Sequence, residues 1–118
     1  MNNGILEICD QNENVLMSIA ESLQGNSMLI QVSGEIRNQV AHEFEDEIMA
    51  AFSVCPNIRI DLKETTYIAS FALRALLAMQ QIVDATEYAS MVICNLSKPV
   101  REVFEQTGFV DILCVEER

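Results

Sequence analysis

Side chains suited to chemistry are few and scattered in this 118-residue chain. His42 is the sole histidine, and acidic residues follow it closely. A general base needs a nucleophile or a substrate within hydrogen-bond reach, so a solvated surface histidine is the ordinary interpretation. No serine stands in a Gly-x-Ser-x-Gly motif, and the glycines are isolated: Gly4, Gly25, Gly34 and Gly108. The lack of a nucleophile motif and of a glycine-rich phosphate loop indicates that the protein is not an enzyme.

Residue types that bind metals are present, but not at ligand spacing. Carboxylates that follow one another on a helix splay round its axis, so we expect a solvated acidic face from Glu43, Glu45, Asp46 and Glu47. The cysteines are widely spaced, and each lies in or beside an apolar run: Cys9, Cys55, Cys94 and Cys114. We therefore expect reduced, buried thiols, no metal site and no cofactor.

Composition narrows the classes of partner. Seven Lys and Arg oppose eighteen Asp and Glu, which leaves a net charge of -11. Such a surface repels phosphate backbones and anionic lipid, so it disfavours nucleic acid and favours a basic or neutral protein partner. No apolar run approaches the ~18–20 residues that cross a bilayer, and the first residues lack a signal-peptide pattern. We expect a cytoplasmic protein without direct membrane insertion.

The elements that must position these residues alternate along the chain. Strands and helices are predicted in the order strand 28–32, helix from 38, strand 58–62, helix 70–84, strand 89–94, helix from 98 and strand 112–115. Ser97 is the predicted N-cap of the last helix, and Gly108 lies just past its end. This order requires parallel strands with right-handed crossovers. We therefore predict one α/β domain over residues 1–118, with four to six strands covered by three to four helices.

The first 26 residues leave two interpretations open. Residues 5–8 favour a strand, whereas residues 15–23 fit a strand or a helix about equally. We favour a hairpin with residues 28–32 through the turn at 24–26, as an atypical N-terminal extension. In the core we expect strand 58–62 at the centre, with Ile60, Leu76, Val92 and Phe104 packed together.

Three stretches match patterns of a known family in the right order. Residues 28–36 end in Gly-Glu-Ile, residues 58–77 hold a strand, a loop and a helix, and residues 95–109 hold Ser-Lys-Pro-Val-Arg-Glu-Val-Phe before Thr-Gly-Phe. Together they resemble STAS domains, the single-domain bacterial anti-sigma factor antagonists and their relatives. The resemblance covers about residues 28–115 and implies a STAS-like fold.

The resemblance implies a partner switch. An unmodified antagonist docks on an anti-sigma factor that is also a serine kinase, and phosphorylation of a serine at the start of the second helix abolishes docking. Ser70 corresponds to that serine, although from the residues alone it equally suits a helix N-cap. The implied binding surface consists of Ser33, Glu35, Arg37, Ala69, Phe71, Ala72 and Arg74.

This surface departs from the family pattern. Where the family usually has Asp-Ser, a small residue and Gly, this chain has Ala69-Ser70-Phe71-Ala72, and Arg37 replaces a frequent acidic residue. The departures lie on the recognition surface and are consistent with an unusual partner. Phe71 is either tucked into the core or an exposed hydrophobic anchor.

The resemblance leaves open in which cellular process the protein acts. We expect a bacterial regulator of transcription, monomeric or weakly dimeric, that binds an anti-sigma factor of the serine-kinase type. STAS-like proteins also serve as cytoplasmic subunits of lipid-trafficking ABC transporters. A third possibility is a domain that binds a small ligand or a nucleotide at the carboxyl ends of its strands.

Overall fold

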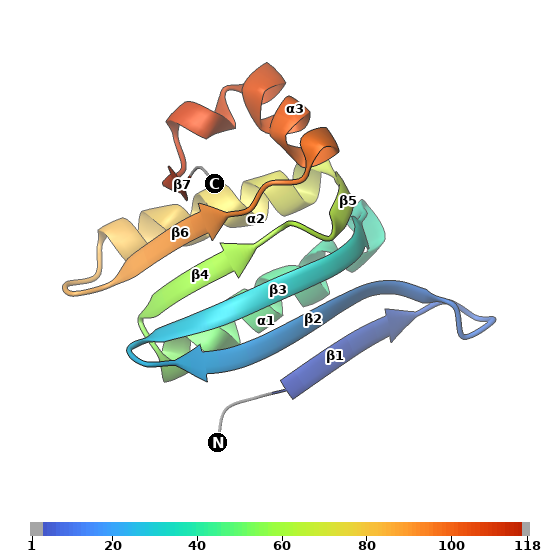
Figure 1. Ribbon diagram of the computed structural model, residues 1–118, viewed down its shortest axis with the longest axis horizontal. Coiled ribbons are helices and arrows are strands. Elements are labelled where there is room, and N and C mark those ends of the chain that lie inside the picture. The colour runs from blue at the N-terminus through green and yellow to red at the C-terminus, as the bar shows by residue number, and fades with distance from the viewer. Residues whose placement is uncertain (1–3, 117–118) are drawn as a thin grey trace.

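Strand β3 organises the sheet of the computed structural model, which describes residues 4–116 (Figure 1). It pairs antiparallel with β2 and parallel with both β4 and β5. The strand order is β1-β2-β3-β4-β6-β7, with β5 beside the end of β3. The strands are β1 (Gly4–Cys9), β2 (Val15–Gln24), β3 (Ser27–Ile36), β4 (Asn57–Asp61), β5 (Thr65–Ile68), β6 (Ser90–Cys94) and β7 (Val115–Glu116).

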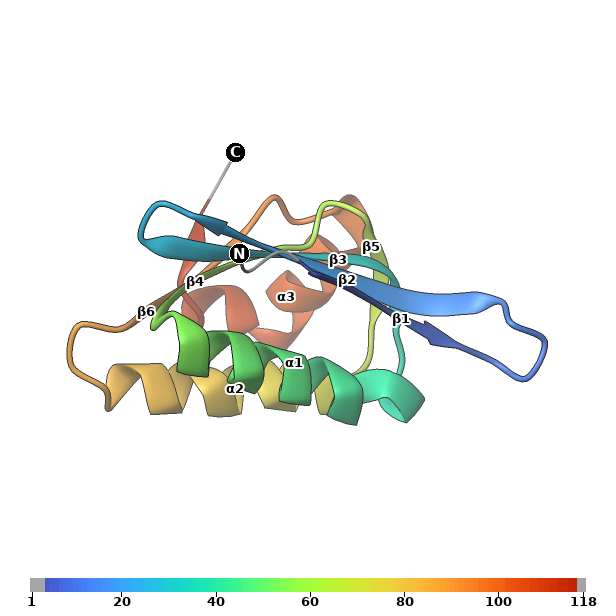
Figure 2. The same ribbon diagram turned by 90° about the horizontal axis from the view of Figure 1, so that it is seen from below.

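Three α-helices lie on one face of this sheet (Figure 2). They are α1 (Ala41–Val54), α2 (Ser70–Asp84) and α3 (Lys98–Thr107), with short 3-10 helices at η1 (Asn38–Val40) and η2 (Phe109–Asp111). The mixed sheet covered by helices confirms the predicted fold class, and β4 lies at its centre between β3 and β6. The opposite face of the sheet carries no helix among residues 4–116.

The N-terminal hairpin forms as the sequence favoured. Gln24 lies opposite Ser27 across a two-residue turn in which Gly25 has a positive φ, so residues 15–23 are a strand and not a helix. Gly34 also needs to be glycine. Its φ is +96°, and a Cβ there would lie 2.6 Å from the carbonyl oxygen of Leu16 on β2. Glycine thus lets β2 and β3 stay paired where β3 bends toward the helices.

Two strand predictions need correction. Residues 65–68, taken as loop, form β5, because the end of β3 offers them a parallel partner from Gly34 to Ile36. Residues 112–115, predicted as a strand, mostly continue the turn of η2, and only Val115–Glu116 form a strand beside β6. The apolar run there instead places Leu113 in the core.

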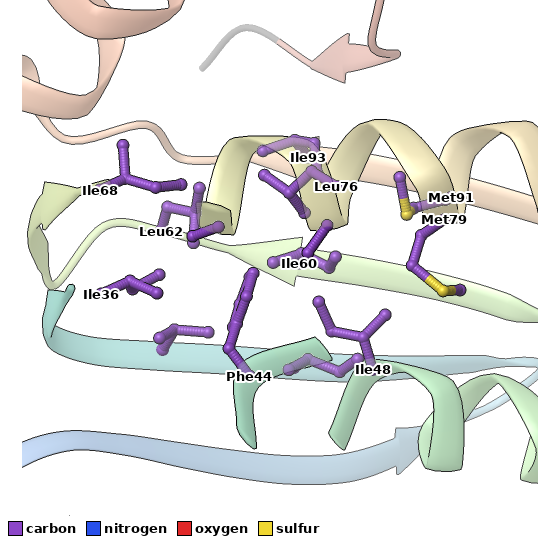
Figure 3. Close-up of a cluster of buried hydrophobic side chains, with 14 of the residues drawn as sticks. Ile36, Phe44, Ile48, Ile60, Leu62, Ile68, Leu76, Met79, Met91 and Ile93 are labelled. Carbon is purple, nitrogen blue, oxygen red and sulfur yellow. The ribbon is translucent and has the colours of Figure 1, made fainter. Parts of the chain in front are cut away.

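The core lies between the sheet and the helices, and Figure 3 shows its central side chains. Phe44 and Ile48 of α1 meet Ile60 of β4, and Leu76 of α2 packs on the same cluster. Ile60, Leu76 and Phe104 are fully buried, as predicted. The prediction for Val92 is wrong: Val92 is only partly buried, because Met91 and Ile93 are the β6 side chains that join the core.

The cysteines divide into two pairs. Cys55 and Cys94 are buried, and burial raises the pKa of the Cys94 thiol. Cys9 and Cys114 are exposed, which corrects the expectation that all four are buried. Cys9 ends an edge strand and Cys114 precedes the short β7, so neither is covered by a helix. All four thiols are free.

One contact between β2 and α1 joins like charges. Partial burial, together with the neighbouring Glu47 carboxyl, raises the pKa of Glu21 to about 7. One carboxyl oxygen of Glu21 and one of Glu43 are buried without a hydrogen-bond donor among the described residues. The sequence predicted a solvated acidic face on α1. This prediction is wrong in part, because Glu43 and Glu47 are half-buried. His42 is exposed and lies 3.2 Å from the Asp46 carboxylate.

This contact predicts a pH-dependent stability. The raised pKa means that the folded protein holds a proton on Glu21 that the unfolded chain has released, so its contribution is present below about pH 4.5 and is lost as pH rises through about 7. At pH 8 the Glu21 carboxyl is charged, so Glu21→Gln should raise the free energy of unfolding above that of the unaltered protein. At pH 5, where the carboxyl is protonated, the difference between the two proteins should be smaller. Solvent screening limits the gain to about 1 kcal/mol. Urea unfolding of both proteins at the two pH values measures it, and identical pH profiles would contradict the assignment.

Candidate functional site

The ends of two parallel strands and the start of a helix enclose an open cleft. Since Ile36 of β3 lies beside Ile68 of β5, both strands end at the same edge of the sheet, where α2 begins. The cleft has a volume of about 550 Å³ and is lined by Glu35, Arg37, Asn38, Gln39, Thr66, Tyr67 and Ala69. In parallel α/β sheets, this edge is where loops and helix starts present side chains to partners and ligands.

The start of α2 is held by a side chain from the preceding crossover. The Ala69 amide donates to the Ile36 carbonyl at 2.8 Å, which fixes the entry of the chain. The Phe71 amide donates to Oδ1 of Asn38 at 3.0 Å, so Asn38 satisfies one of the free amides of the first turn. Ser70 is the first residue of the helix and its side chain makes no cap. The interpretation of Ser70 as an N-cap is therefore wrong, and its hydroxyl is exposed.

Exchanging Asn38 for alanine should cost more stability than exchanging Ser70. Asn38→Ala leaves the Phe71 amide without its acceptor, so we expect the free energy of unfolding to fall by about 1 kcal/mol. Ser70→Ala removes no such bond and should change it by less than about 0.5 kcal/mol. Urea denaturation of both variants makes the comparison. An equal or larger loss for Ser70→Ala would return the capping role to the serine.

Phe71 projects from the first turn of α2. Its side chain is 52% exposed, which decides between the core and the anchor interpretation in favour of exposure. The Arg74 guanidinium lies over its ring, with 5.6 Å from the Cζ atom to the ring centroid. A second, smaller hollow of about 220 Å³ lies beside Phe71 between α1 and α2, lined by Asn38, Ala41, His42, Glu45, Phe71 and Ala75.

The structure brings together some of the residues that the sequence indicated. Glu35 and Arg37 form an ion pair at the rim of the cleft, beside Ala69. Ala69 and Ala72 are buried, so they shape the surface from below rather than offering side chains to a partner. Ser33 lies apart from this surface. It follows the buried Val32 on β3, so its side chain points to the opposite face of the sheet, which carries no helix.

Sequence reasoning missed the polar residues between these positions. Asn38 and Gln39 follow β3 directly, and Thr66 and Tyr67 lie on β5. Their signal was their place at the ends of parallel strands, where side chains from different segments converge. It was hidden because β5 has only four residues and no clear alternation.

The arrangement suits binding. An exposed hydroxyl at Ser70 lies at the positive end of the α2 dipole, and Arg74 follows one turn later on the same side. Such a position accommodates added negative charge without disturbing the fold. Residues 4–116 hold no group of three or more histidine, cysteine or acidic side chains that could bind a metal ion. None of their helices is long and apolar enough to cross a membrane.

Known proteins share this architecture. The STAS domain family model matches residues 18–117. An anti-sigma factor antagonist from Mycobacterium paratuberculosis is similar over 92% of this chain and 89% of its own, with a TM-score of 0.76 and 18% identity. The putative anti-sigma factor antagonist of Thermotoga maritima covers 85% of this chain and 86% of its own, with a TM-score of 0.76 and 15% identity.

The Bacillus anti-sigma factor antagonist SpoIIAA is also similar. Its unphosphorylated form covers 85% of this chain and 87% of its own, with a TM-score of 0.70 and 16% identity. Its phosphorylated form covers 85% and 90%, with a TM-score of 0.65 and 14% identity. No curated protein matches the chain significantly. At these identities the likeness to solved structures concerns the fold.

Proposed function

The chain belongs to the STAS domain family, and we propose that it acts as an anti-sigma factor antagonist that binds an anti-sigma factor of the serine-kinase type. The observation that carries the proposal is the pairing of an exposed serine hydroxyl with an exposed aromatic ring on one helical turn, at Ser70 and Phe71. The half-exposed phenylalanine is a candidate binding anchor, because burying the rest of its ring against a partner stabilises the complex by about 0.8–1.5 kcal/mol.

The docking surface consists of Phe71 and Arg74 on α2, with Glu35 and Arg37 at the rim of the cleft. It is mixed in character: Arg74 lies over the apolar ring of Phe71, and Arg37 and Glu35 form an ion pair at the rim of the cleft. Because the rest of the chain is strongly acidic, these arginines allow an approach to acidic groups of a partner. Binding there in the unmodified state would hold the anti-sigma factor and so free its sigma factor.

Ser70 supplies the regulation in this proposal. Phosphorylation adds close to two negative charges at the edge of the Phe71 surface. The charges are tolerated in the free protein, where the helix terminus and solvent stabilise them. They are not tolerated in a complex that removes water from that turn, so the modified protein dissociates.

Paired capture from the native cell tests the proposal. The unaltered protein, Phe71→Asp and the control Tyr88→Asp serve as baits, because Tyr88 is also exposed but lies after α2, at the opposite end of that helix. We expect a kinase-like anti-sigma factor with the unaltered protein and with Tyr88→Asp, but not with Phe71→Asp. The purified protein should then displace the sigma factor from that anti-sigma factor in size-exclusion chromatography.

Other outcomes assign the surface differently. Capture of an ABC transporter nucleotide-binding subunit that is lost with Phe71→Asp would make the protein a transporter subunit and contradict the antagonist assignment. Capture that is unaffected by Phe71→Asp would remove the α2 surface from partner binding.

A further inference from the structure

Strand β1 forms one edge of the sheet, and nothing in residues 4–116 pairs with its outer side. It lies at the end of the strand order and pairs only with β2, in register from Gly4 to Ile8 (Figure 1). A register shift follows between Ile8 and Cys9. An edge strand presents a row of unpaired amides and carbonyls that can template the addition of another strand.

This edge carries little of the usual protection: one charged side chain, Glu7, and a register shift confined to its end. Natural edge strands are blunted by lysine, by proline or by a covering helix, but β1 has the sequence Gly-Ile-Leu-Glu-Ile-Cys. Ile5 is 77% exposed. Its partner Ala20 follows the buried Ile19, and because side chains alternate along a strand, Ala20 and Ile5 both point to the helix-free face. The STAS match begins at residue 18, so β1 lies outside the part of the chain that the family model describes.

The charges around this edge are of one sign. Neither the β1–β2 hairpin, residues 4–24, nor α1, residues 41–54, contains a lysine or an arginine. Their acidic residues are Glu7, Asp10, Glu13, Glu21, Glu43, Glu45, Asp46 and Glu47. This field attracts a basic segment, whereas it repels a second copy of a chain whose net charge is -11.

We propose that the free edge of β1 takes an extended, lysine- or arginine-bearing segment of another protein as an additional strand of the sheet. This interface is separate from the Ser70 surface, which lies beyond the ends of β3 and β5 on the other side of α1. Backbone hydrogen bonds supply the affinity in such strand addition, and alternate side chains supply the specificity.

The register of β1 defines which side chains the added strand must carry. Leu6 and Ile8 lie opposite the buried Ile19 and Met17, so they face the helices and favour apolar neighbours. Ile5 and Glu7 face the helix-free side, where Glu7 favours a cationic neighbour. The matching segment therefore alternates apolar and basic residues.

The glycine at the start of β1 lies opposite a partly buried acidic group of β2. Gly4 lies opposite Glu21 and has no side chain to cover it. One oxygen of Glu21 has no hydrogen-bond donor, and the Glu47 carboxyl lies beside it. Both carboxyl groups add negative charge on the helix side of the edge, beside Gly4.

Peptide titration followed by NMR tests the proposal. The probe is a ten-residue peptide that alternates lysine with valine, and its control replaces every lysine by glutamate. We expect the lysine peptide to shift the amide resonances of residues 4–9 and to protect alternate β1 amides from hydrogen exchange. Raising the salt from 50 to 500 mM should weaken the binding about tenfold or more. The glutamate peptide should not bind.

A charge-reversed edge gives the matched control. Ile5→Lys/Glu7→Lys changes two exposed β1 positions and should weaken binding of the lysine peptide about tenfold or more, with an unchanged melting temperature. Tyr88→Lys/Glu87→Lys makes the same change in net charge in the exposed turn between α2 and β6 and should bind as the unaltered protein does.

Three results would overturn the proposal. Lysine-peptide shifts that centre on residues 69–74, or that spread over the acidic face without protecting β1 amides, would show charge attraction without strand addition. Equal weakening by the two double variants would have the same meaning. A dimer in sedimentation velocity that Ile5→Lys dissociates would assign the edge to a second copy of the chain.

Discussion

Replacing Phe104 by alanine should lower the free energy of unfolding by about 3–5 kcal/mol, the usual loss for truncating a core aromatic. Phe104 is fully buried on the inner face of α3 and belongs to the same cluster as the residues of α1, α2 and the sheet. Its removal leaves a cavity that the short α3 cannot close, because Ser97 holds the start of the helix on the Thr65 carbonyl. Urea denaturation followed by circular dichroism measures the change.

Tyr88→Ala is the control, because it truncates an aromatic that is almost fully exposed. It should change the free energy of unfolding by less than about 0.5 kcal/mol. A loss below about 1 kcal/mol for Phe104→Ala would mean that α3 contributes little to the core. The packing of residues 98–107 onto the sheet would then need revision.

The sequence identified the elements where one periodicity dominates. A helix was expected from residue 38, and Phe44 and Ile48 lie one turn apart on the buried face of α1. The Ser97 and Gly108 signals bracket α3 as expected. Ser97 accepts a hydrogen bond from the Val100 amide, and Gly108 takes the left-handed conformation at the end of the helix. These signals are local, so the sequence carries them in full.

The errors arise where distant residues decide. Asn38 caps α2 from 33 positions before Phe71, and no local pattern announces such a contact. The strand β5 exists because β3 extends to Ile36 and offers it a partner. Val92 was misplaced because every residue of the run from Met91 to Cys94 is apolar, so its alternation does not reveal which side faces the helices.

The candidate site was predictable in its position, but not in which side chains it exposes to a partner. The resemblance placed Ser70 at the start of the second helix, where the structure also has it. The exposure of Phe71, by contrast, depends on how α1 and α2 pack, because the ring lies beside the hollow between them. The same packing buries Ala72, so two neighbours in the sequence differ completely in what they offer a partner.

Exchanging Ser70 for glutamate should weaken the complex with the anti-sigma factor about 30-fold or more. A carboxylate introduced beside Phe71 must lose its water when the surface is covered, and a buried charge without a partner costs about 2–5 kcal/mol. The folded protein itself should be unaffected or slightly stabilised, because an acidic residue in the first turn of α2 interacts favourably with the helix dipole. Isothermal titration calorimetry with the purified partner measures the affinity, and urea denaturation measures the stability.

The matched variants separate charge from size. Ser70→Ala removes the phosphorylatable hydroxyl without adding charge, so it should bind within about threefold of the unaltered protein. Ser70→Gln has the bulk of glutamate without its charge and should lose less than about tenfold. If Ser70→Gln and Ser70→Glu lose the same affinity, crowding rather than charge governs this position. If Ser70→Glu binds as tightly as the unaltered protein, Ser70 lies outside the interface, and the protein binds its partner constitutively through Phe71.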